Sequence, residues 1–132
     1  MIKTSATSYR YPDIVVVCDN DPSAQDTIRE SPLLIIEILS KSTRKKDKGE
    51  KRKEYLSLPS LQEYVLIEQD FAEIEVQRKS ENWRPCFYTL GDTVVLQSVD
   101  AAFAVKDIYQ RVDNEDMRVF LQQKTASDTE VP

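Results

Sequence analysis

Glu37 is the one charged residue in an apolar run, Leu33 to Leu39, which reads Leu-Leu-Ile-Ile-Glu-Ile-Leu. Such a run predicts a buried strand, and a buried carboxylate is costly unless a cation or hydrogen-bond donors replace the water it loses. A segment rich in lysine follows directly in the sequence. We therefore expect a bound metal ion to compensate the charge of Glu37.

A second carboxylate, Asp13, stands just before another apolar run, Ile14 to Cys18. The segment between the runs, Asp19 to Pro32, reads as a loop without a crossover helix, so the two strands most simply pair antiparallel and bring Asp13 close to Glu37. Adjacent carboxylates repel each other, and a divalent cation between them removes the conflict. The backbone carbonyl of Ile38 is a further candidate ligand. Because the chain has no histidine, its oxygen ligands favour Mg²⁺ or Mn²⁺.

The lysine-rich segment that follows Leu39 contains Asp47, Lys51 and Tyr55, which are spaced four residues apart. In a helix, this spacing puts them on one face. One interpretation is a surface ion pair between Asp47 and Lys51, worth on the order of a few tenths of a kcal/mol, with Tyr55 packed beneath it. The other brings the Lys51 ammonium to a metal-bound water or a scissile phosphate, where positive charge stabilises developing negative charge. The spacing fits both interpretations.

The net charge of −5 hides an asymmetry along the chain. Residues 41–53 contain eight basic residues against two acidic ones, a net charge of +6, which leaves −11 for the remainder. A local basic patch can contact phosphates while the rest of the surface repels them. The candidates for such contacts are Arg44, Lys45, Lys48 and Arg52. A solvated helix face rich in lysine accounts for the same composition.

The composition predicts a single domain in the cytoplasm. We assign residues 1–112 to that domain and expect the polar, acidic residues 113–132 to form a largely disordered tail. No apolar run approaches the roughly 18 residues of a membrane span, and no secretory leader is recognisable, so we expect no membrane partner. Cys18 and Cys86 are not clustered, which favours reduced thiols over a disulfide.

The elements that would position these groups follow from the apolar runs. Ile14 to Cys18 is a β-branched run typical of a central strand covered on both faces. Leu33 to Leu39 predicts a second buried strand, and we expect a helix from about Thr43 to Leu58, weakened by Gly49. Glu63 to Glu68 would complete a strand-helix-strand unit with parallel strands.

The second half of the chain predicts a smaller β region. Ala72 to Arg78 alternates apolar and charged residues, which is typical of a half-exposed strand. Trp83 to Leu90 and Val94 to Gln97 also read as strands, joined by a hairpin turn at Gly91-Asp92. A short helix is expected from Asp107 to Val112.

Several motifs together resemble one protein family. They are Pro12-Asp13, Glu37-Ile38-Leu39, Ser40-Lys41-Ser42-Thr43, Asp47-Lys48-Gly49-Glu50-Lys51, Tyr55 and Leu58-Pro59-Ser60-Leu61-Gln62-Glu63-Tyr64-Val65-Leu66-Ile67. With these motifs the chain, from about Tyr11 to Val112, resembles the Uma-type restriction endonucleases of the PD-(D/E)XK nuclease superfamily. The resemblance implies an α/β (α+β) fold, restriction-endonuclease-like, with a mixed central β-sheet and a flanking helix.

The resemblance also implies a set of site residues. Asp13 and Glu37 match the metal-binding carboxylates of the family. Leu39 occupies the position where the superfamily usually has a lysine, and Lys51 matches a lysine that members of this family carry on the following helix instead. Asp47 and Tyr55 match residues that recur beside that lysine.

One departure from the family concerns the N-terminus. Family members usually have a helical region and further strands before the Tyr11-Pro12-Asp13 segment. We therefore expect this chain to be an N-terminally short member: a truncated product, a fragment starting at a misplaced Met1, or a domain that is completed in a homodimer.

Two functions fit these observations. The first is a DNA endonuclease, a hydrolase of phosphodiester bonds, in which Asp13 and Glu37 bind Mg²⁺ and Lys51 assists the attacking water or the transition state. The second is a catalytically inactive remnant that acts at most as a binding protein, because a shared fold does not guarantee shared chemistry. In a third reading, the helix lysines serve solubility and backbone donors alone satisfy Glu37.

Overall fold

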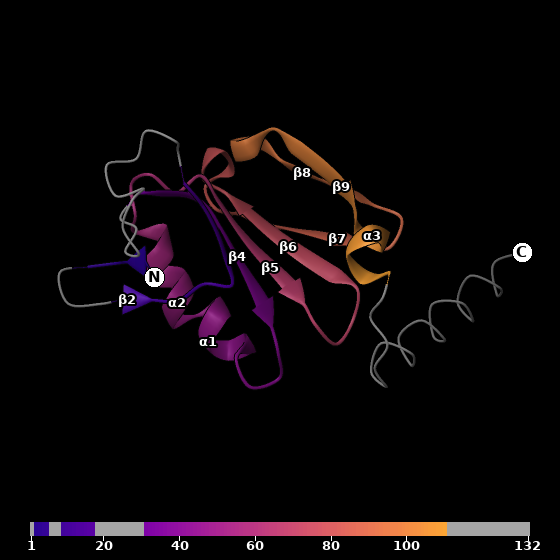
Figure 1. Ribbon diagram of the computed structural model, residues 1–132, viewed down its shortest axis with the longest axis horizontal. Coiled ribbons are helices and arrows are strands. Elements are labelled where there is room, and N and C mark those ends of the chain that lie inside the picture. The colour runs from indigo at the N-terminus through magenta and orange to yellow at the C-terminus, as the bar shows by residue number, and fades with distance from the viewer. Residues whose placement is uncertain (1, 6–8, 18–30, 111–132) are drawn as a thin grey trace, which may run out of the picture.

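The computed structural model describes residues 2–5, 9–17 and 31–110. Among these residues, the centre of the molecule is a mixed sheet with the strand order β3-β4-β5-β6-β7 (Figure 1). Its strands are β3 (Ile14–Val17), β4 (Pro32–Leu39), β5 (Glu63–Glu68), β6 (Glu73–Arg78) and β7 (Pro85–Thr89). The smaller antiparallel pairs are β1 (Ile2–Lys3) with β2 (Tyr9–Arg10), and β8 (Thr93–Leu96) with β9 (Ala101–Ala104).

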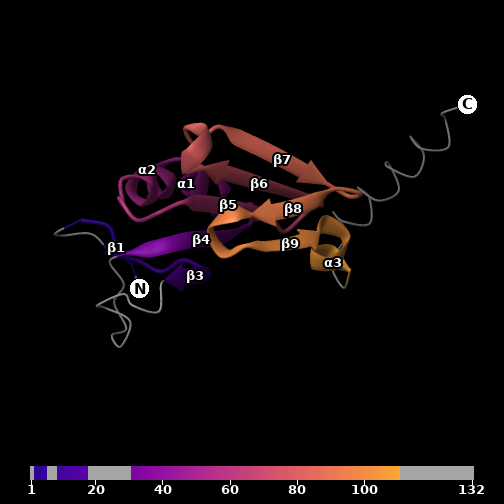
Figure 2. The same cartoon turned by 90° about the horizontal axis from the view of Figure 1, so that it is seen from above.

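The central sheet separates two layers (Figure 2). Helices α1 (Arg44–Lys48) and α2 (Glu50–Leu56) lie on one face, which we call the helix face. The β8–β9 pair and helix α3 (Val105–Tyr109) lie on the other, which we call the hairpin face. Short 3₁₀ turns at Lys79–Glu81 and Gln97–Val99 belong to the connections.

Each face of the sheet has its own apolar core, because successive side chains of a strand point to opposite sides. The hairpin face buries Leu34, Val65, Ala72, Ile74, Val76, Val94, Leu96, Val105 and Tyr109. The helix face buries Ile2, Ile35, Leu39, Tyr55, Leu58, Leu61, Tyr64 and Leu66. Glu37 lies between Ile35 and Leu39 in the alternation of β4, so its side chain belongs to the helix face.

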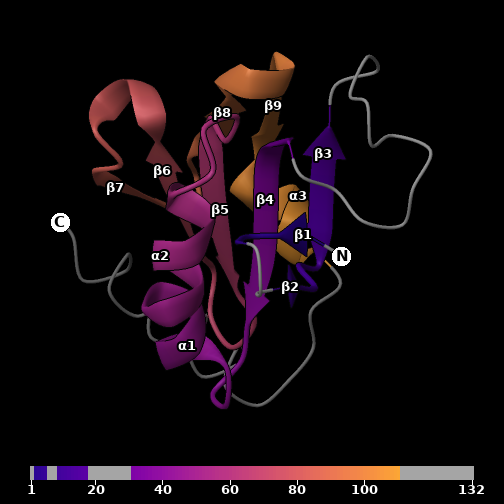
Figure 3. The ribbon, with the colours of Figure 1, turned by 90° about the vertical axis from the view of Figure 1, so that its left-hand side faces the viewer.

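The predicted strand-helix-strand unit is confirmed. β4 and β5 pair in parallel, with Glu37 opposite Leu66, and α1 and α2 connect them across one face (Figure 3). β3 pairs antiparallel with β4, with Ile14 opposite Ile36. This pairing was predicted because the sequence between the two strands reads as a loop without a crossover helix. The result is a mixed α+β architecture, a mixed central sheet with flanking helices, consistent with a restriction-endonuclease-like fold.

The burial predicted for two strands is wrong. Among the described strands, β3 lies at the edge of the sheet rather than at its centre, and Ile14 is 47% exposed. β-branched residues suit a half-buried edge strand as well as a central one, so composition did not separate the two. β6 is almost entirely buried rather than half exposed, because its polar residues have charged partners: Glu75 contacts Lys48 of α1, and Arg78 contacts Glu63 of the neighbouring strand β5. Cys18 lies outside the described residues.

The predicted single helix is interrupted. α1 ends and α2 begins at Gly49, whose φ of −113° and ψ of −94° are not helical. A Cβ atom at this position would lie 3.0 Å from the carbonyl oxygen of Lys45, so glycine permits the close approach. None of the helices in the part of the chain that the structure describes is long and apolar enough to cross a membrane.

The predicted hairpin at Gly91-Asp92 is wrong in its pairing. The turn exists, with a φ of 98° at Gly91, but β7 pairs with β6 and β8 pairs with β9. The chain thus passes from one sheet to another at this turn. β9 was not predicted, and α3 begins at Val105 instead of Asp107. The predicted tail at 113–132 and nearly all of the predicted loop at 19–32 lie outside the described residues.

Candidate active site

A cleft opens at the carboxyl end of β4, beside the start of β3. It has a volume of about 430 Å³. Its lining combines two carboxylates, a lysine and several hydroxyl and amide groups: Tyr11, Asp13, Glu37, Ile38, Ser40, Thr43, Lys51 and Gln69. The strand pairing and the helix thus bring together three groups that are far apart in the sequence.

Glu37 is buried at the base of this cleft, with 2% of its surface exposed. The hydroxyl of Tyr55 donates a hydrogen bond to Glu37 Oε1 at 3.1 Å. The ammonium of Lys51 lies 3.8 Å from Glu37 Oε2. Side chains of α2 therefore compensate the buried charge, and the reading in which backbone donors alone satisfy Glu37 does not hold.

Asp13 reaches the same place from the end of the loop before β3. Its Oδ2 accepts a hydrogen bond of 2.7 Å from the backbone N–H of Ile38, the residue that follows Glu37. This bond links the start of β3 to the end of β4. The expectation that antiparallel pairing brings Asp13 near Glu37 is thus confirmed, with Asp13 exposed and Glu37 buried.

The spacing of Asp47, Lys51 and Tyr55 predicted that they share one helix face, and this is confirmed for Lys51 and Tyr55. Lys51 and Tyr55 both point from α2 to Glu37, and Tyr55 is fully buried against the ring of Tyr64, with ring centroids 5.6 Å apart. The side chain of Asp47 lies outside the described part of the chain, so its surface pair with Lys51 stays a prediction.

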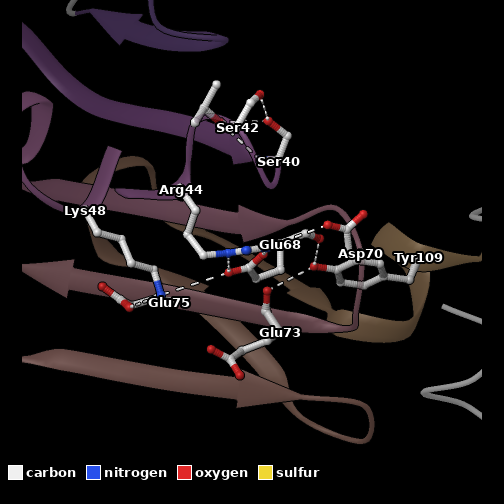
Figure 4. Close-up of polar contacts among 10 residues, drawn as sticks. Ser40, Ser42, Arg44, Lys48, Glu68, Asp70, Glu73, Glu75 and Tyr109 are labelled. Carbon is white, nitrogen blue, oxygen red and sulfur yellow. Dashed lines mark hydrogen bonds and ion pairs between the residues drawn. The ribbon is translucent and has the colours of Figure 1, made fainter. Parts of the chain in front are cut away.

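The turn that leads from β4 into α1 forms one wall of the cleft with its hydroxyl groups. Ser40 Oγ lies 3.0 Å from Ser42 Oγ and 3.1 Å from Thr43 Oγ1 (Figure 4). Thr43 Oγ1 also accepts a hydrogen bond of 3.1 Å from the backbone N–H of Ser40. Hydroxyl groups both donate and accept hydrogen bonds, so this wall can contact phosphate oxygens or water.

Three of the predicted phosphate-contacting residues face the sheet. Arg44 donates two hydrogen bonds of 2.8 Å to the carboxylate of Glu68 (Figure 4). The ammonium of Lys48 lies 3.7 Å from Glu75 Oε1 and 4.0 Å from Glu68 Oε1. Arg52 Nε donates to Gln77 Oε1 at 2.5 Å.

We call this set of contacts, from Arg44, Lys48 and Arg52 to Glu68, Glu75 and Gln77, the helix–sheet ladder. The hydrogen bonds from Arg44 to Glu68 raise the pKa of Arg44. Sequence reasoning missed the sheet side of the ladder, since polar residues in alternation along a strand usually indicate a solvent-exposed face. The fourth candidate, Lys45, is exposed and has no ion pair with any described residue.

The donor set of the cleft fits a hard cation that keeps several waters. Within the described ranges, no three Asp, Glu, Cys or His side chains gather in a way that could hold a metal ion. Asp13, Glu37 and the Ile38 carbonyl would supply oxygen ligands only, which suits Mg²⁺ because this ion is commonly bound through one or two carboxylates with water and phosphate completing its shell.

The sequence matches one known family. Residues 1–106 match the Uma2 family, which is described as "Putative restriction endonuclease". Two uncharacterized proteins of Synechocystis sp. are similar: slr1290 is 33% identical over 105 residues, covering 78% of this chain and 55% of its own length. The other, sll1609, is 39% identical over 75 residues, covering 54% of this chain and 42% of its own. The chain thus spans about half the length of the curated relatives it matches.

Proposed function

This chain belongs to the Uma2 family, and on that basis we propose that it is a metal-dependent endonuclease that hydrolyses phosphodiester bonds in DNA. The observation that carries the proposal is the contact of Lys51 with the buried Glu37 in a cleft that also contains Asp13. A buried carboxylate, a nearby carboxylate and a lysine are the groups that metal-assisted phosphodiester hydrolysis needs.

Asp13, Glu37 and the backbone carbonyl of Ile38 would hold Mg²⁺ or Mn²⁺. A bound divalent ion supplies a Lewis acid and lowers the pKa of a coordinated water. Ile38 directly follows Glu37, and the hydrogen bond from its backbone N–H keeps the Asp13 carboxylate near the end of β4. The hydroxyl of Tyr55 holds the Glu37 carboxylate from its other side.

Lys51 would place a fixed positive charge next to the reacting phosphate. Its ammonium lies 3.8 Å from Glu37 Oε2, and its side chain is only 18% exposed. Charges act more strongly where water is scarce. The lysine would assist the attacking water or stabilise the negative charge that develops on the phosphate. We assign Asp47 a supporting role on the same helix stripe.

DNA would be held through its backbone rather than its bases, because phosphate contacts position a protein without reading sequence. Lys45 is the best supported of the four candidates, since Arg44, Lys48 and Arg52 have partners in the helix–sheet ladder. The net charge of −5 opposes DNA overall, so binding would be weak. A cytoplasmic location and a homodimer remain predictions.

The test is cleavage of supercoiled plasmid with Mg²⁺ or Mn²⁺. We expect the wild-type chain to nick the plasmid only when the ion is present. Lys51→Ala should lower the rate on the order of a hundredfold, because it removes a charge that acts in the transition state. Lys53→Ala, which changes an exposed lysine of the same helix, is the matched control and should cleave like the wild type.

Equal nicking by the wild type and a Glu37→Ala, Lys51→Ala double variant would contradict the proposal. It would indicate that the cleavage came from a contaminating nuclease.

A second candidate is the inactive remnant, and the small number of acidic ligands in the described cleft favours it. A thermal melt with and without Mg²⁺ separates the two, since a ligand that binds only the folded state raises its stability. A rise in Tm at millimolar Mg²⁺ that Glu37→Ala abolishes supports the endonuclease. An unchanged Tm favours the remnant.

A further inference from the structure

Glu68, Glu75 and Gln77 are buried on the helix face but do not line the cleft. They are 2%, 6% and 2% exposed. Burying a polar group costs free energy unless it has a partner. Arg44, Lys48 and Arg52 of the helix–sheet ladder are the partners here. The proposed chemistry uses none of these three residues, so their burial needs another explanation.

The helix side of the ladder is a second stripe with its own spacing. Arg44, Lys48 and Arg52 are four apart and share one face of the helical segment. Lys51 directly precedes Arg52, and neighbouring residues on a helix lie about 100° apart around its axis. One stripe therefore faces β5 and β6 while the other faces Glu37 on β4.

The interruption at Gly49 makes this double anchoring necessary. Arg44 and Lys48 belong to α1, whereas Arg52 belongs to α2 together with Lys51 and Tyr55. Because Gly49 is not helical, the orientation of one short helix does not fix that of the other. Ladder contacts on both sides of the break fix the rotation of each helix against the sheet.

We propose that Glu68, Glu75 and Gln77 are positioning residues. Through Arg44, Lys48 and Arg52 they set the rotation of α1 and α2 that aims Lys51 and Tyr55 at Glu37. This inference deepens the proposed function, on which its catalytic significance rests, while the geometry that it explains is independent of cleavage.

The energetics of buried ion pairs indicate that the ladder orients Lys51 and Tyr55 rather than simply stabilising the fold. Replacing a buried ion pair with apolar residues of similar volume is often neutral or stabilising. An apolar contact is also less directional, whereas the two hydrogen bonds from Arg44 to Glu68 define one orientation. The ladder should therefore matter more for the direction of Lys51 and Tyr55 than for the free energy of unfolding.

The test measures whether the ladder controls the contact between Glu37 and Tyr55. A double-mutant cycle with Glu37→Gln and Tyr55→Phe gives the coupling free energy of this pair from urea unfolding without metal. The cycle is then repeated in an Arg52→Met, Gln77→Leu background, which removes both partners of the ladder contact on α2, the helix that carries Tyr55. We expect the coupling to fall to near zero while the background itself unfolds near the wild-type midpoint.

A milder pair of backgrounds provides the matched comparison. Arg52→Lys keeps the charge but loses the Nε–H group that donates to Gln77 Oε1, so the coupling should fall here too. Arg78→Lys makes the equivalent change to a buried arginine on the hairpin face, where Arg78 Nε donates to Glu63. This control should lower stability and leave the coupling unchanged.

Each result decides the proposal. Unchanged coupling in the Arg52→Lys background overturns it, and this variant decides alone if the double background does not fold. An equal loss of coupling in Arg78→Lys also overturns it, because the coupling would then report general loosening. Absence of cleavage by the wild type refutes the proposed function only. In an active enzyme, Gln77→Leu should lower kcat and leave KM for DNA unchanged, because buried Gln77 is not a candidate for DNA contact.

Discussion

Each face of the central sheet has an ion pair with a buried carboxylate, but the two pairs have different roles. On the hairpin face, Glu63 and Arg78 are register partners on β5 and β6, and their side chains are 2% and 4% exposed. On the helix face, Glu68 is similarly buried, but its partner Arg44 is 31% exposed. One pair is sealed inside the molecule, and the other reaches the surface beside the cleft.

The contacts around the sealed pair indicate its role. Arg78 Nη2 donates to the backbone carbonyl of Val95 at 2.7 Å, and Glu63 Oε1 accepts from the backbone N–H of Ser98 at 2.6 Å. Both partners belong to the β8–β9 layer and its turn, so the pair fastens that layer to the sheet. The same device closes the core on one face and orients helices on the other.

Breaking the sealed pair should have the largest effect on stability. Arg78→Met leaves Glu63 as an unpaired buried charge and should lower the free energy of unfolding by about 3–5 kcal/mol. Urea unfolding followed by circular dichroism measures the loss. Adding Glu63→Leu should restore part of it, because the orphaned charge is removed. A loss that does not change in the double variant would show that the charge is not the cause.

The corresponding change on the helix face should cost less. Glu68→Gln removes the charge that Arg44 and Lys48 contact, and we expect a loss of about 1–3 kcal/mol. The loss is smaller because Arg44, at 31% exposure, can recover contact with water. Urea unfolding of both variants under one set of conditions gives the comparison. If Glu68→Gln lost as much as Arg78→Met, exposure of the cation would not explain the difference between the faces.

The sequence predicted the cleft better than the layers around it. Asp13 and Glu37 could be brought together by reasoning because strand alternation and antiparallel pairing are local rules. Lys51 and Tyr55 followed from helical spacing in the same way. All these inferences needed only a segment and its neighbour in the sequence.

The ladder and the edge position of β3 could not be predicted in this way. Whether Glu75 faces water or Lys48 depends on where the helices lie on the sheet, and an alternating pattern does not contain that information. Similarly, the run Ile14 to Val17 does not reveal whether another strand pairs with its outer edge. Predictions failed where burial depended on distant parts of the chain.

Removing one tyrosine hydroxyl from each face of the sheet should also give unequal losses of stability, smaller than those from the ion pairs. Tyr55→Phe removes the hydrogen bond to the buried Glu37 and should cost about 1–3 kcal/mol. Tyr88→Phe on the hairpin face removes an acceptor from Arg78, whose guanidinium keeps its contacts with Glu63 and Val95, so it should cost less. Urea unfolding measures both. A greater loss in Tyr88→Phe would reverse the proposed ranking of these two hydroxyls.

The smallest effect should appear in the pH dependence of the helix face. Burial raises the pKa of Glu73, with Glu68 and Glu75 adding to the rise and Lys48 and Arg44 opposing it. The folded protein therefore holds this proton more tightly than the unfolded chain does. The stability associated with the protonated form is present below about pH 4 and is lost as the pH rises through the folded pKa.

Glu73→Gln removes the carboxylate that burial disfavours, so it should stabilise the protein at pH 7 by on the order of a few tenths of a kcal/mol. Below about pH 4 the wild-type carboxyl is itself neutral, and the gain should vanish. Urea midpoints of both proteins at pH 3.5 and pH 7 measure the difference. A gain of equal size at both pH values would mean that shape or packing, not charge, causes it. The partial burial of Glu73 would then carry no electrostatic cost, and the carboxylates that distinguish the helix face would be those with cationic partners, Glu68 and Glu75.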